Sequence, residues 1–264
     1  MVCCLRFPYK SFIMKMQLTP SLGGTDLLIS GLNKTTLLDY PGCVAATIFT
    51  GGCNFCCPFC HNSGLVLNPS KEEALSEKEV LNFLEKRKNV LKGVCITGGE
   101  PTLQLDLPDF LIRVREIGYR VKLDTNGYQP EVLRKLMKNG LVDYVAMDIK
   151  NCPDKYALTA GMGDAAAGFE IERIKESVEI LLGGSTKHEF RTTVVKELHT
   201  VEDMVRIGQW IKGCDSYYLQ KFQDNGNNIA EGYHEPDDMV LKEMVQAVSG
   251  IRELKGKVHL RGVE

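Results

Sequence analysis

A regular alternation of apolar, β-branched runs with longer stretches of helical period is the feature that most constrains the fold of this chain. The runs that predict buried strands are 44–50, 93–97, 120–124, 141–148, 189–195 and 216–222. The stretches that predict helices are 76–87, 107–118, 131–139, 169–183, 201–213 and 236–249, and a last candidate strand is 257–261. Such a series of β/α units favours a parallel sheet, and we expect an α/β fold with a partial (β/α)6 TIM-like barrel.

Local signals mark the ends of several predicted helices. Ser76 and Glu79 form a capping box before the apolar residues of the first long helix. Gly140 is the expected C-terminal cap of the third. No linker or composition shift divides the chain. We therefore expect residues 31–264 to form a single domain and residues 1–30 to be an N-terminal extension that is partly disordered.

Composition narrows the class of protein. Of 264 residues, 32 are Lys or Arg and 34 are Asp or Glu, so the net charge of -2 implies no general attraction to nucleic acid or anionic membranes. No apolar run approaches the roughly 20 residues that a membrane-spanning helix needs. Charged residues and a proline also interrupt the N-terminal apolar stretch where a signal peptide needs its core. Without an export signal, the 10 cysteines predict reduced thiols or metal ligands in a reducing cytoplasm.

Unusual residues follow the predicted strands. They are GGCNFCCPFCHN (51–62), TGGEP (97–101), DTNG (124–127), DIK (148–150) and LQKFQDNG (219–226). In a parallel α/β barrel these loops emerge together at the carboxyl ends of the strands, where ligands bind. Each motif alone is compatible with a turn, so their shared placement is the stronger indication of a functional site.

The loop after the first predicted strand holds four cysteines in eight positions. Cys53 with Cys56, and Cys57 with Cys60, form two C-x2-C pairs, which suggests a structural zinc site. Zinc sites normally separate two such pairs by a loop, whereas here the pairs abut. A ferredoxin-type electron carrier is a second alternative. It needs a fourth cysteine ligand, and Cys95, Cys152 and Cys214 have no ligand-like neighbour.

A third interpretation takes Cys53, Cys57 and Cys60 as the ligands, in a C-x3-C-x2-C pattern. A [4Fe–4S] cluster held by three cysteines keeps one iron open for chemistry. This pattern, with the aromatic Phe59 before the last cysteine, resembles the signature of the radical S-adenosylmethionine (SAM) superfamily. The resemblance implies that the open iron binds SAM and that one electron cleaves it to a 5'-deoxyadenosyl radical, which abstracts a hydrogen from the substrate. Cys56 stands where the superfamily commonly has a polar residue, and we interpret it as a non-ligand.

Further loops narrow the resemblance. TGGEP matches the GGE motif of the superfamily, which implies that Gly98, Gly99 and Glu100 lie near the ammonium group of SAM. A carboxylate that faces an ammonium is physically sensible. DTNG and MDIK resemble the pyruvate formate-lyase activating enzyme group, which implies Asp124 beside the ribose or methionine end and Lys150 beside the methionine carboxylate. That group also holds a monovalent cation, which by resemblance implicates Asp124, Thr125, Met147 and Asp148.

The resemblance extends upstream of the cysteines. Residues 34–62 resemble the smaller activating proteins of anaerobic ribonucleotide reductase, and the overall match covers about residues 30–222. It implies an anaerobic, cytoplasmic oxidoreductase that installs a glycyl radical on a partner enzyme, most closely an anaerobic ribonucleotide reductase. The implied electron donor is a low-potential protein such as flavodoxin or ferredoxin, and neither nucleic acid nor a membrane is expected as a partner. Because no cysteine-rich insertion is present, we expect one cluster per chain, with 31–264 as the catalytic domain.

One position departs from the activating enzymes. Several of them carry a histidine in the loop after the sixth strand that helps to hold SAM, whereas Phe222 or Gln223 lies there in this sequence. The role of that histidine is therefore not transferred. We expect His61 to order the cysteine loop, and the other histidines to have structural or surface roles.

The sequence leaves two alternative functions open. One is radical SAM chemistry on a small molecule, such as a precursor of a modified nucleobase, which would consume SAM without a protein partner. The other is a non-enzymatic iron–sulfur electron carrier, whose cluster would be indifferent to SAM. The GGE and DTNG loops argue against the electron carrier.

Overall fold

Eight β-strands form one sheet in the computed structural model, which describes residues 27–69 and 74–263. β1 pairs antiparallel with β2, and every later pair of neighbours is parallel. The strands, whose order in the sheet is their order in the sequence, are β1 (Ile29–Thr36), β2 (Ala45–Thr50), β3 (Gly93–Gly98), β4 (Arg120–Thr125), β5 (Tyr144–Asp148), β6 (Lys187–Val194), β7 (Ser216–Lys221) and β8 (Val258–Arg261). The expectation of disorder near the N-terminus concerns residues that lie largely outside the described ranges.

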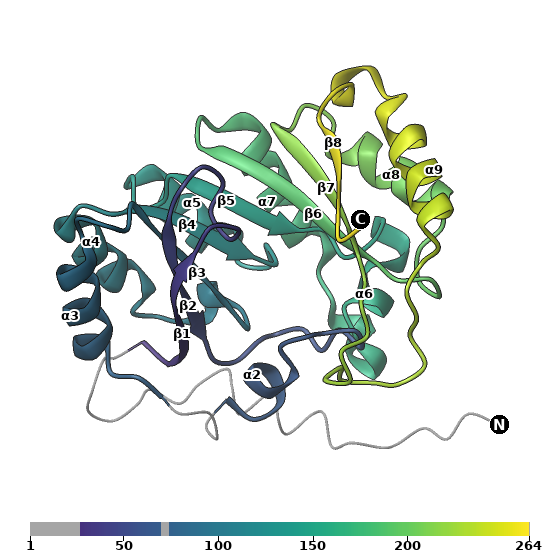
Figure 1. Cartoon of the computed structure of the whole chain (residues 1–264). Helices are drawn as coiled ribbons and strands as arrows, with labels where there is room; N and C mark the ends of the chain where they lie inside the picture. Colours follow the sequence, from purple (N-terminus) through teal and green to yellow (C-terminus); the bar gives the residue numbers. More distant parts are fainter. Residues whose placement is uncertain (1–26, 70–73, 264) are drawn as a thin grey trace.

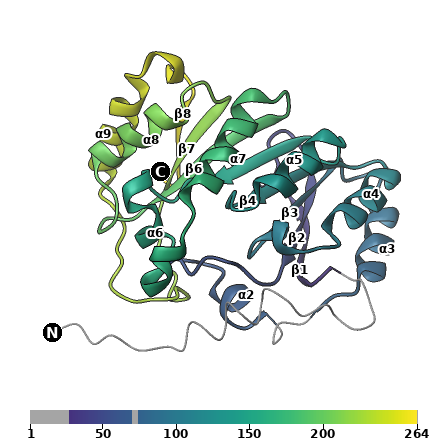
Figure 2. The same cartoon turned by 180° about the vertical axis from the view of Figure 1, so that it is seen from behind.

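Helices connect the parallel strands and cover one side of the sheet (Figures 1 and 2). The longer ones are α3 (Glu77–Arg87), α4 (Leu107–Ile117), α5 (Pro130–Lys138), α7 (Ile171–Gly183), α8 (Val201–Trp210) and α9 (Asp238–Ser249). Short helices are α2 (Ser63–Leu67), α6 (Tyr156–Thr159), and the 3-10 turns η2 (Pro101–Leu103), η3 (Pro153–Lys155), η4 (Gly163–Gly168) and η5 (Arg252–Leu254). No helix in the described part of the chain is long and apolar enough to cross a membrane.

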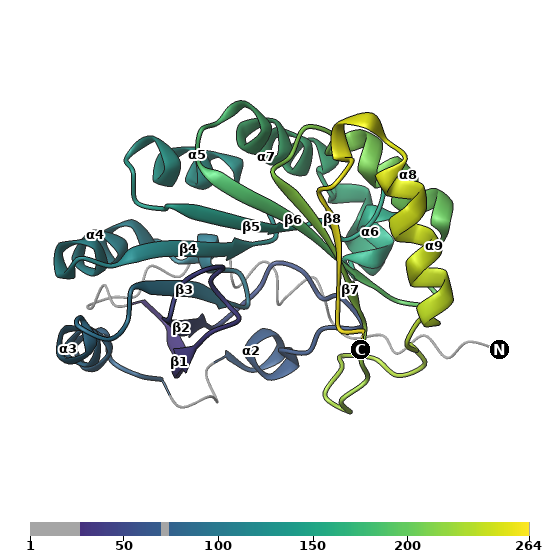
Figure 3. The same ribbon diagram turned by 45° about the horizontal axis from the view of Figure 1, so that its top comes forward.

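The sheet is curved and open. Six β/α units run from β2 to α9, and β1 and β8 form the two edges, as Figure 3 shows. This arrangement confirms the expected partial (β/α)6 barrel in a single α/β domain. The carboxyl ends of all the parallel strands consequently meet at one rim, where the motifs that follow the strands are gathered.

The two faces of the sheet carry opposite kinds of side chain. Successive side chains of a strand point to opposite sides, so alternate residues enter either the helix layer or the concave side. The helix-facing set is largely apolar, and includes the fully buried Ile96, Leu123, Val145, Phe190 and Leu219. The concave set is largely polar, and includes Cys95, Lys122, Asp124, Tyr144, Glu189 and Arg191. The hydrophobic core therefore lies between sheet and helices, and the concave side is available for a polar site.

The predicted helix signals are present. The Ser76 hydroxyl accepts the Glu79 amide at 3.3 Å, and the Glu79 carboxylate accepts the Ser76 amide at 3.0 Å, which completes the capping box of α3. Asn139 is the C-cap of α5, and Gly140 follows it with φ +63. Glycine adopts this backbone conformation without steric cost, so Gly140 allows the chain to leave the helix one residue after the cap.

The strand β1 is not predicted from the sequence. It is an edge strand with exposed residues and two register shifts against β2, so it lacks the apolar alternation of the interior strands. Because it begins at Ile29, the first strand starts inside the expected N-terminal extension. β5 begins at Tyr144 and not at residue 141, because the Leu141 amide bonds to Leu136 O at 2.9 Å and belongs to the end of α5.

Candidate active site

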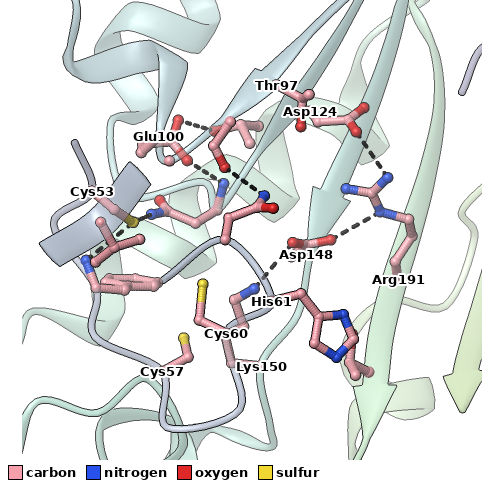
Figure 4. A pocket seen from close by; sticks show the side chains of 18 of the residues that line it. Cys53, Cys57, Cys60, His61, Thr97, Glu100, Asp124, Asp148, Lys150 and Arg191 are labelled. Carbon is pink, nitrogen blue, oxygen red and sulfur yellow. Dashed lines mark hydrogen bonds and ion pairs between the residues drawn. The ribbon is translucent and has the colours of Figure 1, made fainter. Parts of the chain in front are cut away.

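A cavity of about 260 Å³ lies at the carboxyl ends of the parallel strands. Figure 4 shows its wall, to which the loops and ends of several strands contribute side chains. All nine residues predicted for the site line this cavity: Cys53, Cys57, Phe59, Cys60, Gly98, Gly99, Glu100, Asp124 and Lys150. Cys56, interpreted as a non-ligand, is not among the lining residues. The alignment of the strand ends thus brings together motifs that are far apart in the sequence.

The glycines of TGGEP allow two loop backbones to touch. The Gly99 amide donates to Thr50 O and the Glu100 amide donates to Gly52 O, both at 2.8 Å. A Cβ atom on Gly99 would lie 1.9 Å from Gly52 O, and one on Gly98 would lie 2.3 Å from the Thr50 backbone. Gly98 also has φ +123, which side chains disfavour. These glycines are therefore needed to join the loop after β3 to the cysteine loop, whatever ligand they also approach.

Protein contacts hold the cysteine loop from its other side. The Cys56 amide donates to Ala160 O at 3.0 Å, and a Cβ atom on Gly161 would lie 1.9 Å from Cys56 O. The Ala230 amide, in the long loop after β7, donates to Pro58 O at 2.9 Å. Elements on both sides of the rim therefore fix the position of this loop.

The three predicted cluster ligands differ from the other described cysteines in their placement. Cys53, Cys57 and Cys60 line the cavity, whereas Cys43, Cys56, Cys95, Cys152 and Cys214 do not. Burial raises the pKa of each of the three thiols, that of Cys57 to about 12. Thiolates in such a place need a strong positive partner, which iron supplies. Three cavity thiols without a fourth are the donor set of a [4Fe–4S] cluster with one open iron, so these residues fit that group.

A single-ion site is a poorer match to the same loop. In residues 27–69 and 74–263, no three Cys, His, Asp or Glu side chains come close enough together to hold one metal ion. A structural zinc ion requires such convergence, whereas a cluster binds each thiolate through a different iron atom. The geometry therefore favours a cluster over zinc.

Glu100 and Asn126 connect the loops after β3 and β4. The buried Glu100 carboxylate accepts the Thr125 hydroxyl at 2.7 Å and the Asn126 amide at 2.6 Å, among other donors. Burial raises the pKa of Glu100, and these hydrogen bonds oppose the rise. The side-chain amide of Asn126 donates to Asn54 Oδ1 at 2.8 Å and reaches the sulfur of Cys53 at 3.9 Å. Asn126 thus links the Glu100 carboxylate to Cys53, the first of the three predicted ligands.

Five charged side chains form a continuous ion-pair network beside the cavity: Lys122, Asp124, Arg191, Asp148 and Lys150. Figure 4 shows the last four of them. Arg191 bridges both carboxylates, with Nη1 3.0 Å from Asp124 and Nε 2.9 Å from Asp148. Lys122 bonds to the other Asp124 oxygen, and Lys150 bonds to the other Asp148 oxygen at 3.0 Å. Burial alone would raise the pKa of Asp148, but the charges of Arg191 and Lys150 lower it to about 2. Burial also raises the pKa of Asp124, but the charges of Arg191 and Lys122 lower it further than burial raises it. Both carboxylates are therefore ionised at neutral pH.

Three side chains hold the loop that carries Lys150. The carbonyl groups of residues 148–150 each accept a bond, from the Tyr156 hydroxyl at 3.2 Å, the Thr192 hydroxyl at 2.8 Å and His199 Nε2 at 2.8 Å, in that order. The His199 Nδ1 atom accepts a backbone amide at 3.0 Å, so Nε2 carries the proton. Fixing three consecutive peptide groups sets the direction in which the Lys150 side chain leaves the backbone.

Phe222 lies at the position where several activating enzymes are expected to carry a histidine. Its ring is fully buried, stacks on His61 with centroids 5.4 Å apart and meets the edge of Phe59 at 6.3 Å. His61 and Phe59 line the cavity, so Phe222 supports that wall from behind. The stacking is an ordering contact of the kind expected for His61. Gln223 is exposed and does not line the cavity.

Comparison with known proteins identifies the family. Residues 47–208 match the family model described as the radical SAM superfamily. This chain belongs to the radical SAM superfamily. The family implies a [4Fe–4S] cluster and SAM as cofactors of this radical SAM enzyme, in agreement with the donor set of the cavity.

Two relatives of this radical SAM enzyme match most of its length. A protein of Methanocaldococcus jannaschii named as a glycyl-radical enzyme activating enzyme is 36% identical over 198 residues, which are 74% of this chain and 80% of that protein. The pyruvate formate-lyase-activating enzyme of Clostridium pasteurianum is 27% identical over 212 residues, which are 77% of this chain and 85% of that enzyme.

Solved structures share the fold. SuiB of Streptococcus suis, bound to the precursor peptide SuiA, matches with a TM-score of 0.63 and 16% sequence identity. The match covers 83% of this chain and 48% of SuiB, so the radical SAM fold here spans about half the length of that protein. At such identity the likeness shows the fold alone.

Sequence reasoning missed three residues that shape the site, Lys122, Asn126 and Arg191, and expected of His199 only a structural or surface role. Two of them carry a recognisable signal. Lys122 lies two positions before Asp124, and Arg191 lies two positions after Glu189, within strands that were interpreted as buried. A period of two places each pair on one face, where opposite charges compensate each other. His199 carries no such signal, because its hydrogen-bond partners are backbone groups.

Proposed function

We propose that this radical SAM enzyme installs a glycyl radical on a partner enzyme, and that the partner is an anaerobic ribonucleotide reductase. The observation that carries the proposal is the placement of three thiols and an ion-pair network around one cavity. The relative named as an activating enzyme, 36% identical along 80% of its length, supports the activating role. The resemblance of residues 34–62 to the activating proteins of the reductase supports the choice of partner.

In this proposal one side of the cavity holds the cluster. Cys53, Cys57 and Cys60 would each bind one iron, with Phe59 packed between the loop and Phe222. The Asn126 amide, 3.9 Å from the sulfur of Cys53, would donate to that ligand. Hydrogen bonds to cluster sulfurs help to set the reduction potential.

The other side would hold SAM. Gly98, Gly99 and Glu100 line the cavity, and the Glu100 carboxylate would face the SAM ammonium. Charge-assisted hydrogen bonds of this kind are strong. Asp124 would accept from the ribose or methionine end, and Lys150 would face the methionine carboxylate. The bonded carbonyl groups of residues 148–150 would keep Lys150 aimed at that carboxylate without a rearrangement on binding.

When bound, the cluster would relay an electron from the external reductant, and SAM would supply the hydrogen-abstracting radical. The chain itself then needs no general base, because the hydrogen leaves the glycine α-carbon as an atom. Its residues have to bind, orient and exclude water and other quenchers. Phe55, Phe59 and Val66, together with the strand ends, provide the walls that do so.

The side chains of the residues predicted to hold a monovalent cation already have other partners. Both aspartates bond to cationic side chains, and the Thr125 hydroxyl donates to Glu100 at 2.7 Å. The Met147 side chain is fully buried and offers no oxygen ligand. The carboxylate and hydroxyl groups of this set therefore do not fit a resident metal cation, and no role is assigned to one.

The proposal extends to the organisation of the chain and its electron supply. We assign residues 31–264 as the catalytic domain, with β1 beginning at Ile29, just before it. We assign a low-potential flavodoxin or ferredoxin as the reductant, because cleavage of SAM consumes an electron that the chain has to receive from outside.

Anaerobic reconstitution tests this function. The reduced, cluster-loaded protein is incubated with SAM, first alone and then with any anaerobic ribonucleotide reductase that the same genome encodes. We expect formation of 5'-deoxyadenosine and a glycyl radical signal in the electron paramagnetic resonance spectrum of the reductase. Both should vanish with Cys57→Ala.

Other outcomes identify the alternatives. Cleavage of SAM that depends on a small molecule and yields no protein radical would replace the activating role by small-molecule chemistry. An intact cluster, confirmed by iron and sulfide analysis, that neither binds nor cleaves SAM would reduce the protein to an electron carrier.

A further inference from the structure

The ion-pair network carries more positive than negative charge. Three cationic groups, on Lys122, Arg191 and Lys150, face two carboxylates, on Asp124 and Asp148. Within this network one positive charge is therefore left over, while Glu100, in the same cavity wall, lies outside the network and faces only hydroxyl and amide donors. Buried charges are stable when they are compensated, and a single ligand carboxylate would complete the balance. The methionine end of SAM presents such a group.

Every carboxylate oxygen in this network already has a cationic partner. The two Asp124 oxygens bond to Lys122 and, at 3.0 Å, to Arg191. The two Asp148 oxygens bond to Arg191 at 2.9 Å and to Lys150 at 3.0 Å. A sodium or potassium ion would need these hard oxygen ligands. At either carboxylate it would also lie beside two fixed positive charges, whose repulsion is strong in a buried site.

Lys122 contributes to the site without touching the cavity. Its side chain is 2% exposed, and its ammonium contacts Asp124 and, at 3.9 Å, the sulfur of Cys95. Asp124 lines the cavity, whereas Lys122 does not. Because an uncompensated buried ammonium is costly, Lys122 and Asp124 form a unit in which the lysine stands behind the carboxylate. Lys122 therefore acts on a ligand through the position of Asp124 and through its own charge, and not by contact.

We infer that Lys122 is a built-in cation: its ammonium supplies to Asp124 the positive charge that a bound metal ion would supply, so that SAM binds without sodium or potassium. Loss of this ammonium would remove the left-over positive charge of the network and with it part of the attraction for a carboxylate. Lys122 is thus a positioning residue. The inference rests on SAM binding in this cavity, and it is independent of which partner enzyme is activated.

The affinity of the wild-type holoenzyme for SAM tests the inference directly. Isothermal titration calorimetry under anaerobic conditions would compare potassium, sodium and choline chloride at equal ionic strength. We expect the dissociation constant for SAM to change by less than about twofold among the three salts, because all three screen charges equally and no specific cation is needed. A weakening of about tenfold or more in choline would overturn the inference, because it would reveal a required metal ion.

Variants of Lys122 test the role of its charge. Lys122→Met is expected to bind SAM about tenfold or more weakly in choline, the effect of losing a charge-assisted contact. Potassium or methylammonium should restore the affinity by entering the vacated place. Lys122→Arg keeps the charge and should bind SAM equally well in all salts. Weaker binding of Lys122→Met that no cation restores would assign the lysine a purely structural role and overturn the inference, as would wild-type affinity of Lys122→Met in every salt.

Tyr144→Phe is the matched control for a change on the concave side. It removes a hydrogen bond to Glu189 at 2.8 Å and leaves Asp124 untouched, so SAM affinity should equal that of the wild type in each salt. If Lys122→Met does not fold, the wild-type salt series and Lys122→Arg still decide the question. A metal requirement in either of these proteins contradicts a built-in cation.

Discussion

Phe190 and Arg191 are neighbours on β6, yet they serve opposite sides of the sheet. Phe190 is fully buried against the helices, whereas Arg191 bridges Asp124 and Asp148 beside the cavity. The helix side depends on volume and close packing. The concave side depends on charge and on the direction of hydrogen bonds. On this strand, adjacent residues therefore serve stability and ligand binding. Substitutions on the helix side should lower the free energy of unfolding, and substitutions on the concave side should lower the affinity for SAM.

The largest effect is expected at the rim of the concave side, where Cys57→Ala should abolish iron binding and SAM cleavage. Two thiols do not hold the cluster, while contacts of neighbouring residues keep the loop in place. Iron and sulfide content, 5'-deoxyadenosine formation and circular dichroism measure cluster, activity and fold separately. Cys56→Ala, on the same loop, is the matched control and should keep the cluster. A cluster lost in Cys56→Ala as well would refute the assignment of three ligands.

On the helix side, Phe190→Ala should lower the free energy of unfolding by about 3–5 kcal/mol, because a cavity replaces a large buried ring. Phe190→Leu retains much of the volume and should cost clearly less. Urea unfolding of the apoprotein measures both variants. Should Phe190→Ala weaken SAM binding at unchanged stability, the separation of the two sides would not hold.

Arg191→Lys probes the concave side at the adjacent position. Lysine keeps the charge but not the fork that reaches both carboxylates, so the affinity for SAM should fall about tenfold. Arg134→Lys is the control, since that arginine pairs with Glu176 on the surface, where such pairs contribute little. Calorimetric titration distinguishes the two. Equal affinities in both variants would show that the bridge has no influence on the ligand.

Asn126→Ala tests the concave side where the loop after β4 contacts the cysteine loop. Without the amide near the sulfur of Cys53, the reduction potential of the cluster should become more negative, since a hydrogen bond to a cluster ligand favours the reduced form. A redox titration followed by electron paramagnetic resonance measures the shift. Asn54→Ala is the control: it removes Asn54 Oδ1, to which the Asn126 side chain also donates, but keeps the Asn126 amide near Cys53. The reduction potential of this variant should be closer to that of the wild type. An unshifted potential in Asn126→Ala would exclude this contact as a determinant.

The smallest effect concerns the pH dependence of stability. Burial lowers the pKa of His199, so the unfolded chain binds a proton that the folded chain does not. Stability should therefore decline as the pH falls below the unfolded-state value of about 6.5, by up to about 1.4 kcal/mol per pH unit from this residue. His199→Gln should remove that slope. Thr192→Val, which loses the neighbouring bond to Ile149 O, should lower stability equally at each pH. A wild-type slope that survives in His199→Gln would attribute the dependence to another group.

The helix side of the molecule could be predicted from the sequence, and the concave side only in part. Apolar runs and helical periods determine the six β/α units, because burial against helices imposes one kind of residue on every strand. The rim residues Cys53, Cys57 and Cys60 could be found because they share one loop. The network around Arg191 is assembled from three strands, and no local pattern states which carboxylate a given arginine reaches. The edge strand β1 was missed because it has little apolar surface to bury.

The backbone contact between the loop after β3 and the cysteine loop has a consequence for the life of the enzyme in the presence of oxygen. The bonds from Gly99 to Thr50 and from Glu100 to Gly52 extend the sheet into the site. The two loops therefore lose their conformational entropy when the protein folds, and cofactor binding does not have to order them. We therefore expect these two loops to keep their arrangement when an oxidised cluster is lost, so that repair requires a new cluster and no refolding of the chain.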